Sequence, residues 1–156
     1  MNTKQVGAFV LLVPMLIFFL FGCASEESEI ATFTDEESGT EVQVKRTTAH
    51  PFLAEYHHLL VVNWKDGSTA SQSMLPDTGT GENISLYSVG RGSFFVLGMF
   101  DAYMADAERK KITVVFDETT GRKREARDFP PSMELLGWFD EGPTRRWEFR
   151  NADRKE

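Results

Sequence analysis

Three histidines are the residues of this sequence best suited to holding a metal ion, because a neutral imidazole is the commonest metal ligand in proteins. His57 and His58 are neighbours, and His50 precedes them. On a β-strand, successive side chains point to opposite faces, so His57 and His58 could not bind the same ion. Glu55 is the only acid nearby, and the sequence has no HExxH or similar spacing. We therefore predict no metal site and no cofactor.

A second candidate for chemistry is the triplet Asp77-Thr78-Gly79, which resembles the catalytic triplet of aspartic proteases. That chemistry needs two carboxylates that share a proton, so a chain of this length would have to dimerise to provide them. The triplet should leave an apolar strand, whereas Pro76 stands directly before it and the residue types are those of a turn. Residues 75–79 also match the sortase recognition pattern, but the apolar span that should follow is missing. We therefore predict a turn here, no catalytic residues, and a protein that is not an enzyme.

Four cations lie within six residues, at Arg122, Lys123, Arg124 and Arg127. Charges at this density are typical of a solvated loop or an edge strand, where they discourage pairing with other chains. The alternative is a contact for an anionic lipid or glycan, which a local concentration of positive charge would attract. The solvated loop is the simpler interpretation in an acidic protein, and these four residues form the best candidate contact loop.

The segments that position these candidate side chains alternate between apolar and polar residues, which is the pattern of β-strands. Val42 and Val44 alternate with polar neighbours, as in a half-buried strand. The apolar run at residues 59–62 is followed by Asp66-Gly67, a strong hairpin signal. Residues 51–60 are either a helix that begins at a proline or a loop leading into this strand. Further strands are predicted at residues 84–89, 93–105, 111–117, 135–139 and 146–150, with turns at residues 90–92 and 120–121.

Five to seven short strands separated by frequent turns predict a mainly β domain, a small antiparallel β-sandwich or a barrel-like domain. Gly98 interrupts the longest apolar stretch, which indicates a bulge or a close approach. Trp64, Trp138 and Trp147 stand in or beside apolar segments, so we expect them in or at the core. Trp147 and Phe149 should share one face of a strand.

The amino terminus carries a different signal. After Lys4, the run from Val6 to Gly22 contains no charge over 17 residues, as in a secretory signal or a short membrane anchor. It ends in the sequence LFGC at residues 20–23, which resembles the bacterial lipobox. The resemblance implies that Cys23 receives a diacylglycerol thioether, that the peptide is cut before it, and that the new amino terminus is acylated. Phe21 is larger than the residue usually found at its position.

Residues 24–40 contain six acids and no base, a composition that does not favour folding. We therefore predict a signal peptide at residues 1–22, the lipidated Cys23 with a flexible acidic linker at 23–40, and a β-rich domain at 41–156. As a flexible chain the 17 residues after the cysteine would span roughly 20–25 Å. Since Cys23 is the only cysteine, we expect the domain to be held together by its core, without disulfides.

Composition limits the function. The chain has 156 residues, 41% of them hydrophobic, and a net charge of −7, which argues against a nucleic-acid partner. The lipobox resemblance implies a protein anchored by lipid to the bacterial membrane. By the same resemblance, Ala24 in place of an aspartate implies the outer membrane facing the periplasm in a Gram-negative host, whereas in a Gram-positive host the protein would lie on the outer face of the cell membrane. The sequence favours a non-catalytic binding or accessory module for an envelope protein or polymer. A small envelope hydrolase and an inhibitor or immunity lipoprotein remain as alternatives.

Overall fold

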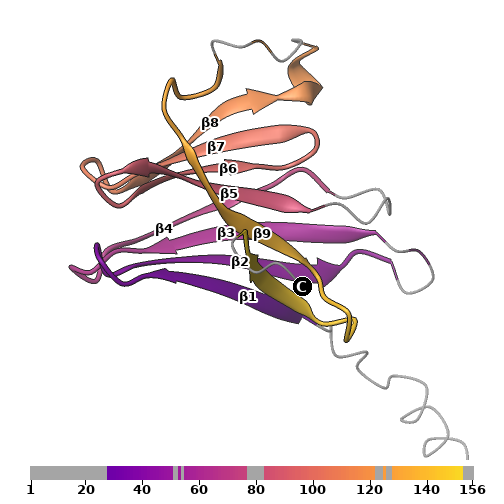
Figure 1. Ribbon diagram of the computed structural model, residues 1–156. Helices are drawn as coiled ribbons and strands as arrows, with labels where there is room; N and C mark the ends of the chain where they lie inside the picture. Colours follow the sequence, from indigo (N-terminus) through magenta and orange to yellow (C-terminus); the bar gives the residue numbers. More distant parts are fainter. Residues whose placement is uncertain are drawn as a thin grey trace, which may run out of the picture.

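The computed structural model describes residues 28–50, 53, 55–76, 83–121, 125 and 128–152. In these residues ten strands form two antiparallel sheets that pack face to face (Figure 1). The predicted fold class, a small antiparallel β-sandwich, is confirmed, and the strands form two separate sheets instead of one closed barrel. No helix within the described residues is both long and apolar enough to cross a membrane.

The smaller sheet contains the first four strands in sequence order. They are β1 (Ser28–Asp35), β2 (Thr40–Thr48), β3 (Tyr56–Asn63) and β4 (Thr69–Ser73). The larger sheet has the order β10-β9-β5-β6-β7-β8. Its members are β5 (Ile84–Gly90), β6 (Ser93–Leu97), β7 (Asp101–Asp106), β8 (Lys111–Asp117), β9 (Glu134–Glu141) and β10 (Trp147–Asn151). A short 3-10 helix, Glu118–Thr120, follows β8.

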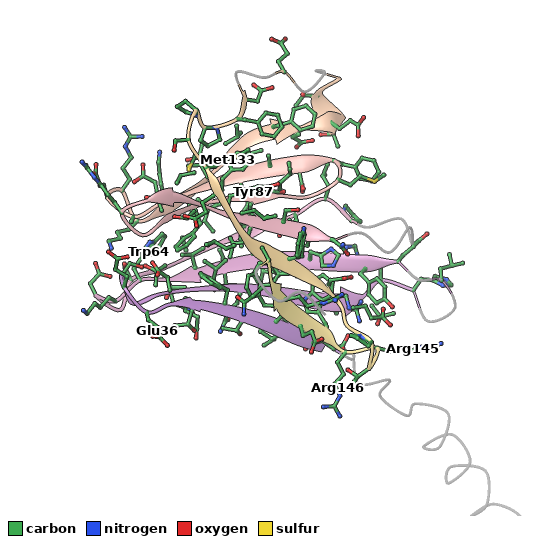
Figure 2. The ribbon with its side chains drawn as sticks, viewed as in Figure 1. Glu36, Trp64, Tyr87, Met133, Arg145 and Arg146 are labelled. Atoms are coloured by element: carbon green, nitrogen blue, oxygen red, sulfur yellow. The ribbon has the colours of Figure 1, made fainter. Side chains whose placement is uncertain are left out.

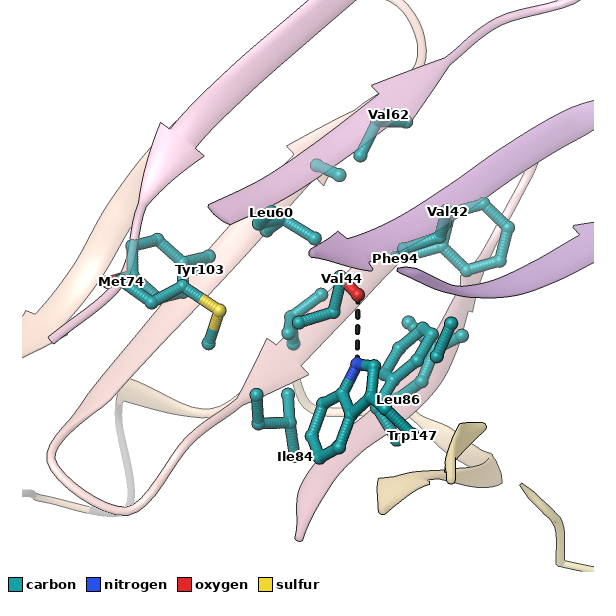
Figure 3. Close-up of a cluster of buried hydrophobic side chains, with 14 of the residues drawn as sticks. Val42, Val44, Leu60, Val62, Met74, Ile84, Leu86, Phe94, Tyr103 and Trp147 are labelled. Carbon is teal, nitrogen blue, oxygen red and sulfur yellow. Dashed lines mark hydrogen bonds between the residues drawn. The ribbon is translucent and has the colours of Figure 1, made fainter. Parts of the chain in front are cut away.

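The main core lies between the two sheets (Figure 3). Val42 and Val44 of β2 are completely buried, as their alternation predicts, and they face Leu86 and Phe94 of the larger sheet. Each large apolar side chain buried in this way contributes about 1.5–3 kcal/mol. Trp147 closes the core at one end, and its indole Nε1 donates a hydrogen bond of 2.9 Å to the carbonyl of Val44 in the opposite sheet.

The tryptophan expectations are confirmed. Trp64 and Trp147 are buried and belong to the main core. Trp138 is half-buried. Phe149 packs against the same core as Trp147, so the two residues share the inward face of β10.

Strand β6 is buried on both of its faces, which explains its continuous apolar sequence. Phe94 and Val96 point into the main core, while Phe95 points to the outer face of the larger sheet and is still 0% exposed. β9 pairs with β5 and not with β8, and residues 128–133, which lead into β9, run over this outer face (Figure 1). Phe129 in this connection packs on Phe95, with 5.8 Å between ring centroids.

The predicted flexible linker is wrong for residues 28–40. Strand β1 pairs with β2 along its whole length, from Ser28 opposite Thr47 to Asp35 opposite Thr40. The acidic composition of this segment obscures the alternating pattern of a strand. Ala31 and the other inward residues pack on the core, while their neighbours face solvent. The β-rich domain therefore begins at residue 28 instead of 41. The predicted signal peptide at 1–22, Cys23 and the rest of the predicted linker lie outside the described residues.

Of the two alternatives for residues 51–60, the helix is wrong from Tyr56 onward, because these residues belong to β3, in which the buried His58 and Leu60 alternate with less buried neighbours. The predicted hairpin at Asp66-Gly67 and the turn at residues 90–92 are confirmed. The prediction of one strand at residues 93–105 is wrong, because these residues form two antiparallel strands, β6 and β7, with a turn between them. Gly98 lies in that turn and is a close approach, because a Cβ at this position would collide with the carboxylate of Asp101.

The two ends of the sandwich differ in their connections. The tight turns β1–β2, β3–β4, β5–β6 and β7–β8 gather at one end, which we call the hairpin end (Figure 1). There an added Cβ at Gly92 would lie 2.7 Å from the Cβ of Ser38, which brings the β5–β6 turn against the β1–β2 turn. The opposite end carries the start of β1 and the β9–β10 loop, and we call it the Arg46 end. Glu36 and Arg145 mark the two ends in Figure 2.

Candidate functional site

Most residues that the sequence singled out for chemistry are not brought together. Cys23, Asp77 and the candidate contact loop (Arg122, Lys123, Arg124 and Arg127) lie outside the described residues. His57 is exposed and His58 is buried, so the prediction that they face opposite ways is confirmed. Within the part of the chain that the structure describes, no three histidine, cysteine or acidic residues are grouped so that they could hold a metal ion.

A hollow of about 230 Å³ opens at the Arg46 end of the sandwich. It is lined by Glu29, Arg46, Thr48, Tyr56, Glu141 and Arg145. Arg46 lies there because it continues the inward-facing series of β2, two positions beyond the buried Val44. Its side chain is only 8% exposed, which is unusual for a cation and demands compensating partners.

The partners of Arg46 come from both sheets. Its Nε donates to Oε2 of Glu29 on β1 at 3.1 Å, and Nη1 donates to Oε2 of Glu141 on β9 at 3.3 Å. The guanidinium carbon lies 4.3 Å from the ring centroid of Tyr56 and 4.8 Å from that of Trp147. Two carboxylates and two aromatic faces therefore hold one cation, and the arrangement ties β1, β2 and β3 to the larger sheet.

Burial alone would lower the pKa of Arg46, but the hydrogen bonds to Glu29 and Glu141, together with electrostatic interactions with Glu29 and Tyr56, outweigh it and raise the pKa above its ordinary value. We call this arrangement the Arg46 clamp: Arg46 with Glu29, Tyr56, Glu141 and Trp147. Since its donors and acceptors satisfy one another, the clamp acts as a structural link.

A second hollow, about 450 Å³ in volume, opens at the hairpin end. We call it the hairpin hollow. It is lined by Phe33, Asp35, Glu37, Ser38, Ser88, Gly90, Arg91, Gly92, Phe94, Glu134 and Leu136. Phe33 packs edge-on against Phe94, with 5.9 Å between centroids, and also contacts Phe149 at 4.9 Å. The base of the hollow is therefore aromatic and joins the main core.

The polar lining of the hairpin hollow is mainly acidic. Asp35, Glu37 and Glu134 supply three carboxylates, and Arg91 is the one base among the described lining residues. The side chain of Arg91 is 89% exposed and its Nη1 lies 3.7 Å from Oε1 of Glu108 on the neighbouring β7–β8 turn. Asp35 accepts a hydrogen bond from the neutral hydroxyl of Ser38. An aromatic base with acidic walls is suited to a ligand that is both flat or apolar and positively charged.

A third polar group of interest, Asp101, is part of the structure's framework. It is 2% exposed, and its Oδ2 accepts hydrogen bonds from the hydroxyl of Tyr103 and from the backbone nitrogen of Leu75 at 2.6 Å. Burial, together with the neighbouring carboxylate of Asp101, raises the pKa of Tyr103 well above its ordinary value, so the hydroxyl remains a donor. These hydrogen bonds hold the segment that follows β4 against β7.

Sequence reasoning missed both hollows. The sequence does contain a signal for Arg46. This residue continues the inward-facing series of Val42 and Val44, and a cation at such a buried position needs a charged partner. The hairpin hollow had no comparable signal, since its walls come from β1, β5, β6 and β9. The two hollows are the candidate sites of this antiparallel β-sandwich.

Comparison of the chain with known proteins gives no match to a protein-family model, to a curated protein or to a solved structure.

Proposed function

We propose that this protein is a lipid-anchored, non-catalytic binding module of the bacterial cell envelope and that it binds its partner at the hairpin end. The observation that carries the proposal is the hairpin hollow, which is about 450 Å³ in volume and has an aromatic base and acidic walls. This volume lies within the range of about 300–1,000 Å³ that is usual for ligand sites. The partner is an envelope protein or polymer.

The lipobox resemblance and the position of β1 support an orientation for the module. Ser28, the first residue of β1, follows Cys23 by five positions, so it can lie at most about 18 Å from the lipidated cysteine. Strand β1 then spans about 26 Å from the Arg46 end to the hairpin end. On a lipid-anchored chain the Arg46 end therefore faces the membrane, and the hairpin hollow faces away from it.

In a Gram-negative host we propose the outer membrane, with the domain in the periplasm. The candidate contact loop, with its four cations between residues 122 and 127, stays a prediction for contact with an anionic lipid or glycan. Its place in the chain, between β8 and β9, differs from that of the described residues that line the hairpin hollow.

Processing tests the anchor. Cys23→Ser should leave an uncleaved precursor that takes up no labelled palmitate, because the thioether forms on the cysteine sulfur. Ser25→Ala is the matched control and should be cleaved and labelled like the wild type. Cleavage of Cys23→Ser at the same bond would overturn the anchoring part of the proposal.

Site-directed photo-crosslinking in intact cells tests the binding surface. A photo-reactive amino acid at Glu37, in the wall of the hairpin hollow, should give one discrete crosslinked envelope component. The same group at Thr113, which is exposed on β8 away from the hollow, serves as the control and should not. Equal crosslinking from the two positions, or none from Glu37, would contradict binding at the hairpin end.

A further inference from the structure

The same two strands place carboxylates at both ends of the sandwich. At the Arg46 end, Glu29 of β1 and Glu141 of β9 bind one guanidinium. At the hairpin end, Asp35 of β1 and Glu134 of β9 line one hollow. Strand β1 presents Glu29 and Asp35 in the same inward register, because they are separated by an even number of positions.

The Arg46 end shows what such a pair of carboxylates holds in this protein. A guanidinium lies against the aromatic faces of Tyr56 and Trp147 and donates to both acids. Arginine is suited to this setting because its planar, weakly hydrated cation can stack on a ring and donate several hydrogen bonds at once. The smaller hollow is thus an internal example of arginine recognition.

The hairpin end has the corresponding acids and rings, and the described chain puts no cation between them. Phe33 and Phe94 supply the aromatic base, Asp35 and Glu134 the acids. Arg91 is the one described base in the lining, and it reaches toward Glu108 on another turn. The volume, about 450 Å³ against about 230 Å³ at the Arg46 end, leaves room for an incoming side chain.

We infer that the hairpin hollow receives an arginine side chain from a basic, extended segment of a partner protein. The inference rests on the proposed function, whose binding surface it assigns to one kind of ligand. The guanidinium stacks on the ring of Phe33 and pairs with Asp35 and Glu134, while Glu37 draws further positive charge of the segment to the rim. Electrostatic attraction of this kind raises the association rate and weakens with salt.

The test uses the full chain purified in detergent and three blocked pentapeptides with a central arginine, citrulline or glutamate between glycines. Citrulline has nearly the shape of arginine but no charge. Nuclear magnetic resonance titration should show the arginine peptide shifting the amide signals of Gly90 and Gly92, with an affinity at least tenfold higher than that of the citrulline peptide. The glutamate peptide should cause no shift, and raising the salt from 50 to 500 mM should weaken arginine binding severalfold.

Variants locate the contact. Glu134→Gln and the pair Asp35→Asn with Glu134→Gln should lower the affinity for the arginine peptide, the pair by at least tenfold. Glu36→Gln is the matched control, because Glu36 is an exposed acid of the same β1–β2 turn that does not line the hollow. Its affinity should equal that of the wild type. Glu134 is exposed, so its single substitution remains informative if the Asp35 change disturbs the turn.

Two results would overturn the inference: equal binding of the citrulline and arginine peptides, or undiminished binding by Glu134→Gln and the folded double variant. Shifts at residues far from Gly90 and Gly92 would also count against it. If the arginine peptide fails while the crosslink from Glu37 persists, the ligand assignment is wrong and the binding module stands. If the crosslink fails as well, the proposed function is wrong.

Discussion

The two ends of the sandwich are built from the same strands but treat their acidic residues differently. At the Arg46 end, the chain supplies its own cation from β2 and satisfies Glu29 and Glu141 internally. At the hairpin end, Asp35 and Glu134 line a hollow with an aromatic base, and Arg91, the one described base of that lining, pairs with Glu108 on another turn. The difference teaches that a buried charge is compatible with the fold only when the chain also provides its partner.

The largest effect is expected at Trp147, which anchors the Arg46 end. Trp147→Ala should destabilise the protein by about 3–5 kcal/mol, because it removes a buried indole, the ring contact to Arg46 and the hydrogen bond to Val44. The free energy of unfolding from urea denaturation measures this loss. Trp147→Phe, which keeps an aromatic ring, should lose clearly less; equal losses would mean that the ring contacts contribute little.

Removal of the clamp cation should have the next largest effect. Arg46→Met leaves Glu29 and Glu141 without a partner, but their side chains are 37% and 42% exposed and can be hydrated. We therefore expect a loss of about 2–3 kcal/mol, below the roughly 3–5 kcal/mol typical of a fully buried broken pair. Arg46→Lys should recover only part of it, because an ammonium cannot donate to both acids in the same geometry. If Arg46→Lys had the full stability of the wild type in a denaturant titration, the clamp would depend on charge alone and not on the geometry of the guanidinium.

Asp101 provides a smaller test of the framework. Tyr103→Phe removes one hydrogen bond to the buried carboxylate of Asp101 but leaves the bond from Leu75 in place. The expected loss is about 1–3 kcal/mol, the range for a buried acceptor that loses a donor. Thermal and urea unfolding of the variant measure it. A Tyr103→Phe protein as stable as the wild type would show that the hydroxyl bond is matched by water in the unfolded chain.

The smallest effect concerns pH and the turns of the hairpin end. Hydrogen bonds from Ser68 and the nearby ammonium of Lys110 lower the pKa of Asp66 from 3.8 to about 2. Because its folded pKa is lowered, Asp66 contributes stability above pH 4, and this contribution is lost as the pH falls toward 2. Asp66→Asn should therefore flatten the dependence of unfolding free energy on pH in this window relative to the wild type. An identical slope in the two proteins would contradict the assignment.

Local pattern was enough to predict most of the strands and their turns. Alternation at Val42 and Val44, the Asp66-Gly67 hairpin and the inward pair of Trp147 and Phe149 all depend on neighbours in sequence. Strand β1 was missed because its acids lie among the inward positions that usually reveal a strand: Glu29 and Asp35 share a face with Ala31. Composition therefore outweighed periodicity in that segment.

The candidate site could not be predicted in the same way. Register between distant strands, such as Ile84 opposite Phe139, is set by tertiary packing that no short window contains. The hairpin hollow depends on that register, because Glu134 and Asp35 line the same hollow only after β9 has joined β5 and the sheets have packed. The basic residues at 122–127 drew attention through composition alone, and their contact role remains a prediction.

The position of β9 also determines the order in which the molecule can mature. Strands β5 to β8 pair with their neighbours along the chain and can form as soon as they are synthesised, whereas the second edge of β5 stays unpaired until residues 134–141 are available. Until then Phe95, on the outer face of β6, also lacks the cover of Phe129. An open edge beside an uncovered apolar surface promotes aggregation. Truncation before β9 should therefore lower the yield of folded protein, and it also removes Phe139 and Trp147 from the main core, so folding is complete only when the carboxyl-terminal strands have joined the larger sheet.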